Sequence, residues 1–187
     1  MFLAIVFFSM LAVPFVWRFG VRTRDSIEHM LGDYAKRRGY RVDRETTEIE
    51  AVVDDVAVRI AGFSISSHGG PTTTWTVQAT AIAKVQGWVR ARPKHEDGPS
   101  GLRMGHLEFD TCFFVDGSSR ADATKVLGPE VRKLLLGFGP RGQTDYEDGA
   151  FTFTWDHAQA IDADLDGAIA LAVAACRLPA REGLYRD

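Results

Sequence analysis

The first seventeen residues, MFLAIVFFSMLAVPFVW, contain no charged side chain, and Arg18, Arg22 and Arg24 follow directly. As a helix this run would be about 25 Å long, at about 1.5 Å per residue, which is the short limit for crossing a membrane core. Extending the helix to Val21, with the Arg18 side chain reaching toward the lipid headgroups, supplies the missing length. We therefore expect residues 1–21 to form a single transmembrane anchor.

A cleavable signal peptide and a buried core helix are the two alternatives for this segment. A signal peptide carries positive charge before its apolar run and small residues at a cleavage site after it. Here only the terminal amine precedes the run, and its far end reads PFVWR. A core helix of a soluble domain normally has a polar stripe, which this run lacks. The anchor is the interpretation that fits all three observations.

The basic residues near the segment all lie on its C-terminal side. After the first three arginines come Lys36, Arg37, Arg38 and Arg41. The positive-inside rule then places the folded part in the cytoplasm, so we expect a single-pass protein of the inner (cell) membrane. The same basic cluster could hold the first soluble helix near anionic headgroups, and a solvated helix face is the alternative.

Composition indicates one soluble domain after the anchor, over residues 22–187. The chain has 187 residues, of which 45% are hydrophobic and 25% charged, enough for one domain with its own core. The net charge of -3 provides no basic field, so we expect no nucleic-acid partner. Cys112 and Cys176 lie far apart and outside any Cys/His cluster, so we expect two buried free thiols rather than a disulfide or a zinc site.

Hydrophobic periodicity predicts the elements of this domain. Helical spacing predicts helices over about 25–38, 118–127 and 128–138, and a fourth helix from about Asp162. In the helix over 128–138, Pro129 lies in the first turn and Gly137 is the expected C-cap. Alternation predicts strands over 46–53 and 56–65, joined by a turn at Asp54 and Asp55, and strands over 72–85 and 106–117. It also predicts a hairpin over 145–155 that turns at Asp148 and Gly149. Because no regular βαβ alternation appears, the predicted fold class is α+β, with a mostly antiparallel sheet packed with helices.

Two of these strands carry more specific expectations. In the strand around Trp75, apolar residues alternate with Thr74, Thr76, Gln78 and Thr80, which predicts one wet face. In the strand over 106–117, the apolar residues that should share one face are Leu107, Phe109, Phe113 and Val115. Between them, the Pro- and Gly-rich stretch over 92–106 predicts a loop and is a candidate subdomain boundary.

Two glycine- or aspartate-rich motifs resemble binding loops but lack the required context. GFGPRG, from Gly137 to Gly142, has the spacing of a dinucleotide-binding loop, yet it follows a predicted helix instead of a strand. DADLDG, from Asp162 to Gly167, matches the first half of an EF-hand calcium loop, but Val173 stands where the bidentate glutamate should be. We therefore expect no cofactor and no metal, and we interpret the aspartates as helix caps.

Candidate catalytic residues are few. None of the five histidines forms an i,i+4 pair or an HExxH motif. The weak candidates for a polar active site are His95, His106 and Asp110, with Glu96 beside His95. WVRARPK, from Trp88 to Lys94, interleaves aromatic and basic residues as single-strand nucleic-acid binders do, but with a negative chain we interpret it as an exposed strand face.

The second half of the chain resembles a family of uncharacterised bacterial membrane-anchored proteins with a domain of unknown function. The resemblance lies in a Phe-Asp strand, a Leu-x-Pro helix and an Asp-Gly hairpin, and it covers about residues 45–157. The matching residues are Phe109, Asp110, Phe113 and Val115, then Leu127, Pro129 and Leu134 to Leu136, then Gly149 to Phe153. Members often have two N-terminal spans, whereas this chain has room for one. The resemblance implies a membrane-tethered domain and carries no catalytic signature.

From these observations we expect a non-enzymatic adaptor or sensor that is held at the membrane by residues 1–21 and binds an unidentified protein partner. Two alternatives stay open. One is a membrane-tethered hydrolase that uses His95, His106 and Asp110, which would require a pocket joining them. The other is a domain that binds a lipid or small ligand between its sheet and helices, which would require an internal cavity of some hundreds of cubic ångströms.

Overall fold

The computed structural model describes residues 25–43, 45–67, 70–81, 85–94, 101–156 and 162–177. Within these ranges no helix is both long enough and apolar enough to cross a bilayer. The predicted anchor, residues 1–21, lies outside the described residues.

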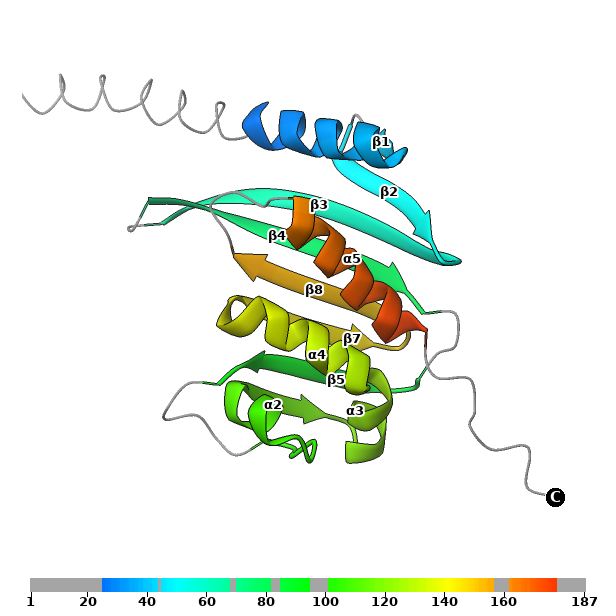
Figure 1. Ribbon diagram of the computed structural model, residues 1–187, viewed down its shortest axis with the longest axis vertical. Coiled ribbons are helices and arrows are strands. Elements are labelled where there is room, and N and C mark those ends of the chain that lie inside the picture. Colours follow the sequence, from blue (N-terminus) through cyan, green and yellow to red (C-terminus); the bar gives the residue numbers. More distant parts are fainter. Residues whose placement is uncertain are drawn as a thin grey trace, which may run out of the picture.

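One antiparallel sheet of eight strands forms the centre of the domain (Figure 1). Its spatial order is β1-β2-β3-β4-β8-β7-β5-β6, and each neighbouring pair is antiparallel. The strands are β1 Arg41–Asp43, β2 Glu48–Val53, β3 Val56–Ser67, β4 Gly70–Thr80, β5 Trp88–Pro93, β6 Phe113–Gly117, β7 Gly142–Glu147 and β8 Ala150–Asp156. The predicted α+β class with a mostly antiparallel sheet is confirmed.

The helices lie on one face of this sheet (Figure 1). They are a helix over residues 25–38, α2 Leu107–Cys112, α3 Arg120–Val126, α4 Pro129–Phe138 with the short 3₁₀ turn η1 Gly139–Arg141, and α5 Asp162–Cys176. In α5 the predicted stripe of Leu165, Ile169, Val173 and Cys176 is buried, and several alanines are buried with it. This helix is apolar on most of its surface because it packs against β3, β4, β8 and α4.

The two predicted tight turns are present. Asp54 and Asp55, between β2 and β3, have φ values of 53° and 67°. Asp148 and Gly149, between β7 and β8, have φ values of 47° and 94°. Two consecutive residues with positive φ form the two-residue turn whose twist matches that of an antiparallel hairpin.

Alternation along β4 and β8 separates the core from the opposite face. Trp75, Phe153 and Trp155 are buried toward the helices, and the Phe153 and Trp155 rings stack with centroids 5.3 Å apart. A Cβ atom at Gly142 would lie 2.5 Å from the Phe153 ring, so glycine lets the start of β7 approach this cluster. The threonines between the aromatic residues point to the other face, as predicted for the strand around Trp75.

The strand predicted over 106–117 is wrong in its first half. Residues 107–112 form α2, and the strand begins only at Phe113. His106 caps the helix by accepting a hydrogen bond from the Phe109 amide, and Leu107, predicted to be core, is 86% exposed. Capping by a side chain outweighs the alternation over these six residues. A smaller difference is that the C-cap of α4 is Gly139, with a φ of 61°, and not Gly137.

Candidate functional site

The face of the sheet opposite the helices is the most distinctive surface of the described chain, and no described helix covers it. Because side chains alternate along each strand, one residue of every strand lines up across this face in a single row, which we call the central row. From β1 to β6 it consists of Arg41, Glu50, Arg59, Gln78, Thr152, Asp145, Arg90 and Asp116. Six of the eight side chains carry a charge.

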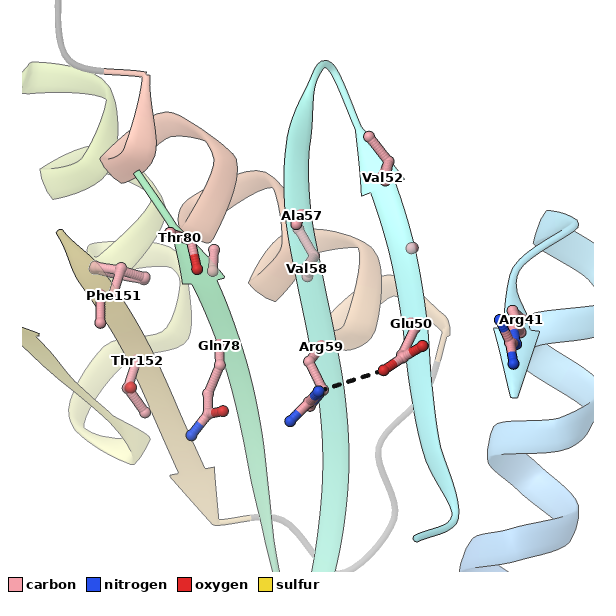
Figure 2. Close-up of a pocket in the computed structure, with 13 residues that line it drawn as sticks. Arg41, Glu50, Val52, Ala57, Val58, Arg59, Gln78, Thr80, Phe151 and Thr152 are labelled. Carbon is pink, nitrogen blue, oxygen red and sulfur yellow. Dashed lines mark hydrogen bonds and ion pairs between the residues drawn. The ribbon is translucent and has the colours of Figure 1, made fainter. Parts of the chain in front are cut away.

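A groove of about 620 Å³ crosses one half of this open face (Figure 2). This volume lies in the range of about 300–1,000 Å³ that is typical of ligand sites. Its walls combine the long polar side chains of the central row with the small or apolar side chains of the next row along the strands, which are Val52, Ala57, Thr80 and Ala150. The lining residues of the open face are Arg41, Glu50, Val52, Ala57, Arg59, Gln78, Thr80, Ala150 and Thr152.

Charges in the groove are arranged by cross-strand pairing. The Arg59 guanidinium lies 3.2 Å from a carboxylate oxygen of Glu48 and 3.3 Å from one of Glu50 (Figure 2 shows the second contact). Arg41 lies opposite Glu50 in the register of β1 and β2. The apolar side of the groove includes Val52, whose side chain is 73% exposed. The groove therefore offers donors, acceptors and an apolar contact within one surface.

The other half of the open face carries the Trp88–Lys94 motif. It forms an exposed strand face, as predicted: Arg90 and Arg92 are exposed, while Val89 and Ala91 are buried on the other side of the strand. The Arg90 guanidinium lies over the Trp88 ring, 5.5 Å from its centroid, and also pairs with Asp145 on β7. A second groove of about 400 Å³, at one end of the central strands, includes Gln143, Thr154 and Arg141 in its lining. Both grooves are on the open face, and neither lies between the sheet and the helices.

Two of the predicted catalytic candidates, His106 and Asp110, lie among the described residues. His95 and Glu96 lie outside them. The Nδ1 atom of His106 accepts a hydrogen bond from the Phe109 amide, and the two Asp110 carboxylate oxygens accept from the amides of Met104 and Gly105, at 2.8 and 3.0 Å. These contacts close the loop before α2, so both side chains shape the backbone there.

Two aspartates of the DADLDG motif, Asp162 and Asp166, contact the helix over residues 25–38. Asp162 accepts two hydrogen bonds from Arg37, at 2.8 and 3.0 Å, and Asp166 accepts one from the Tyr34 hydroxyl at 2.7 Å and pairs with Arg38. Thus two of the arginines that we considered for contacts with lipid headgroups are engaged within the domain. Among the described residues no cluster of three metal-ligating side chains occurs.

The two cysteines differ, contrary to the prediction that both are buried. Cys176 is buried in α5, whereas Cys112, at the end of α2, is exposed. Burial raises the pKa of the Cys176 thiol to about 12. We expect an aromatic disulfide reagent at about pH 8 to modify one thiol per native chain and both after denaturation, because the thiolate is the reactive form. Rapid modification of two thiols in the native chain would contradict this assignment.

The open-face residues were not singled out as a site from the sequence. Alternation predicted a wet face for the strand of Gln78, but only the register of eight strands brings Glu50, Arg59, Gln78 and Thr152 into one row. The available signal was the series of charged or polar residues at alternate positions in each predicted strand.

In comparisons with known proteins, the structure is similar to the crystal structure of the mycobacterial trehalose monomycolate transport factor A. The TM-score is 0.56, with 10% sequence identity, and the match covers 79% of this chain and 91% of that chain. At this identity the likeness shows a shared fold. No protein-family model and no curated protein matches the chain in sequence.

Proposed function

We propose that this chain is a non-enzymatic adaptor, held at the membrane by residues 1–21, that binds a partner protein through the open face of its sheet. The observation that carries the proposal is the open face itself: eight strands present a row of charged side chains with Val52 and Phe63 exposed beside it, at 73% and 54%. Ordered charges can select a protein partner by electrostatic complementarity, and the exposed Val52 and Phe63 add apolar contact area beside them.

The shared fold is consistent with an accessory role. The similar mycobacterial protein is described as a transport factor, which suggests a protein that assists transport, and we extend that role to this chain as part of the proposal. The hydrolase alternative has less support, because His106 and Asp110 are engaged in helix capping and loop closure. The resemblance to a membrane-anchored bacterial family, inferred from the sequence, is compatible with the same role.

A second candidate function is binding of a polar ligand, such as a sugar headgroup, in the groove of β1–β4 and β8. The groove's Gln78, Thr80 and Thr152 side chains offer amide and hydroxyl groups suited to sugar hydroxyls, and the name of the similar protein includes trehalose monomycolate. Calorimetric titration of the full chain with trehalose tests this candidate. Binding that is weakened by Gln78→Ala would favour it, and no heat of binding would argue against it.

Site-specific photocrosslinking tests the adaptor proposal in native membranes. A photoreactive residue at Gln78 or Thr152, on the open face, should give protein adducts. The same residue at Glu130 or Lys133, exposed on α4, should not. The yield of adducts should also fall when the substitution Arg59→Glu is added, since it reverses one charge of the central row. Equal adducts from both faces, or none from the open face, would overturn the proposal.

Membrane attachment and a cytoplasmic position of the domain are part of the same proposal. Deleting residues 1–21 should move the chain from the membrane fraction to the soluble fraction with its helix and strand content unchanged, because the described residues form a large hydrophobic core among themselves. Circular dichroism and fractionation measure both. Insolubility with loss of secondary structure would show that the segment packs as core.

A reporter fused after Asp187 that is active only in the cytoplasm tests the orientation.

A further inference from the structure

The charges of the central row are antisymmetric about the middle of the sheet. Read from β1 to β6, their signs are plus, minus, plus, neutral, neutral, minus, plus and minus. Reversing the order therefore exchanges every positive charge with a negative one. Such a row is complementary to a reversed copy of itself.

A two-fold axis parallel to the strands, midway between β4 and β8, performs this reversal when two open faces meet. It places β1 of one copy over β6 of the other, β2 over β5, β3 over β7, and β4 over β8. Arg41 then faces Asp116, Glu50 faces Arg90, and Arg59 faces Asp145, while Gln78 faces Thr152. Each contact occurs twice, as in any interface with this symmetry.

The residues beside the central row follow the same rule. Because β2 and β5 run in opposite directions, Glu48 and Arg92 lie on one side of the row and Val52 and Trp88 on the other. The axis brings Glu48 over Arg92, again with opposite charges. It also brings the exposed Val52 over the Trp88 ring, which joins two apolar groups. None of these pairs places like charges together.

We propose that the open face is a two-fold interface between two copies of this chain. The inference rests on the proposed function, since it names a second copy as the protein that the open face binds. Charge complementarity argues for this occupant, because a surface that is complementary to its own reversed copy needs no other partner to satisfy it.

The size of the face is adequate for such a contact. Eight strands spaced by about 4.8 Å, with an average length of about 20 Å, present on the order of 700 Å² per copy. A stable interface buries about 800 Å² per partner. Two sheets pack at about 10 Å, a gap that the arginine and glutamate side chains of the row can bridge from both sides.

Contacts within each chain do not use up the charges of the row. Arg59 already lies near Glu48 and Glu50, and Arg90 near Asp145. These are half-exposed pairs, which hold their partners weakly in water. A guanidinium has five N–H donors, so each arginine can donate to the carboxylate of its own chain and also to a second carboxylate on the other copy.

Paired charge reversals test the interface. Full chains in detergent micelles, labelled on the exposed Cys112 with donor or acceptor dyes, report self-association by energy transfer. Arg90→Glu places two glutamates opposite each other at positions 50 and 90, and Glu50→Arg places two arginines there. Each variant alone should associate roughly a hundredfold more weakly than the wild type, because like charges then meet twice.

Mixing the two variants should restore association, since position 90 of one chain again meets an opposite charge at position 50 of the other. Restoration requires both variants to be folded, so it also excludes unfolding as the cause of the loss. Lys133→Glu, on the exposed side of α4, is the control and should associate like the wild type.

Three results would overturn the inference: no energy transfer by the wild type, equal transfer by the single variants, or loss that mixing does not restore. If the wild type is monomeric while the open face still crosslinks to another protein, this inference fails and the adaptor function stands. If neither self-association nor any open-face adduct is found, both fail.

Discussion

Replacing Phe153 by alanine should lower the free energy of unfolding by about 3–5 kcal/mol, the usual cost of removing a fully buried phenyl ring. Phe153 is fully buried in β8, with the Phe138 ring 4.6 Å and the Trp155 ring 5.3 Å from it, centroid to centroid. Its loss opens a cavity between the sheet and α4 that neither neighbour can fill. Denaturant unfolding of the detergent-solubilised chain, followed by tryptophan fluorescence, measures the change.

Thr152→Ala is the matched control for this substitution. It truncates the next residue of the same strand, but on the open face, and should change the unfolding free energy by less than about 1 kcal/mol. Phe153→Leu should lie between the two, because leucine retains part of the buried volume. A loss for Phe153→Ala no larger than that of the control would mean that the face assignment of β8 is wrong.

Asp166→Ala should destabilise the domain by about 1–3 kcal/mol, because it removes the acceptor of a hydrogen bond from a buried tyrosine. Asp166 accepts from the Tyr34 hydroxyl at 2.7 Å, and Tyr34 is fully buried. Its pairing with Arg38 is half-exposed and should add little. Asp162→Ala, which breaks the exposed Arg37 contact on the same helix, is the control and should cost less. An equal loss of unfolding free energy in both variants would contradict the proposed contribution of the hydrogen bond between Tyr34 and Asp166.

The same contact predicts a dependence on alkaline pH. Burial, and then the hydrogen bond to Asp166, raise the pKa of Tyr34 well above its ordinary value of 10.0. An acid whose pKa is raised by folding stabilises the native state below its unfolded pKa, and this stabilisation is lost as the pH rises above about 10. Asp166→Ala should therefore flatten the alkaline fall of stability, measured as unfolding free energy against pH. An unchanged slope would exclude Asp166 as a main cause.

This contact also links the helix over residues 25–38 to α5, 125 or more positions later in the chain. If residues 1–21 are an anchor, as we propose, this helix is the first folded element after it. The contacts of Tyr34, Arg37 and Arg38 with α5 attach this helix to the rest of the domain.

Local patterns predicted most of the elements correctly. The turns at Asp54–Asp55 and Asp148–Gly149, Pro129 at the start of α4 and the stripe of α5 all depend on residues close together in sequence. The helix over 107–112 was missed because Phe109 and Phe113 fit a strand alternation equally well. The contact between His106 and the Phe109 amide, which caps the helix, is visible only in three dimensions.

The candidate site was likewise predictable from the sequence only in part. Alternation in the sequence predicted a wet face for the strand that contains Gln78, because the side-chain period of a strand is two. Only the tertiary structure decided that these strands are neighbours, and in which register, since β3, β4 and β8 pair across as many as 82 positions of chain. Cross-strand hydrogen bonds and the shared core under the helices set that order, and the row of alternating charges follows from it.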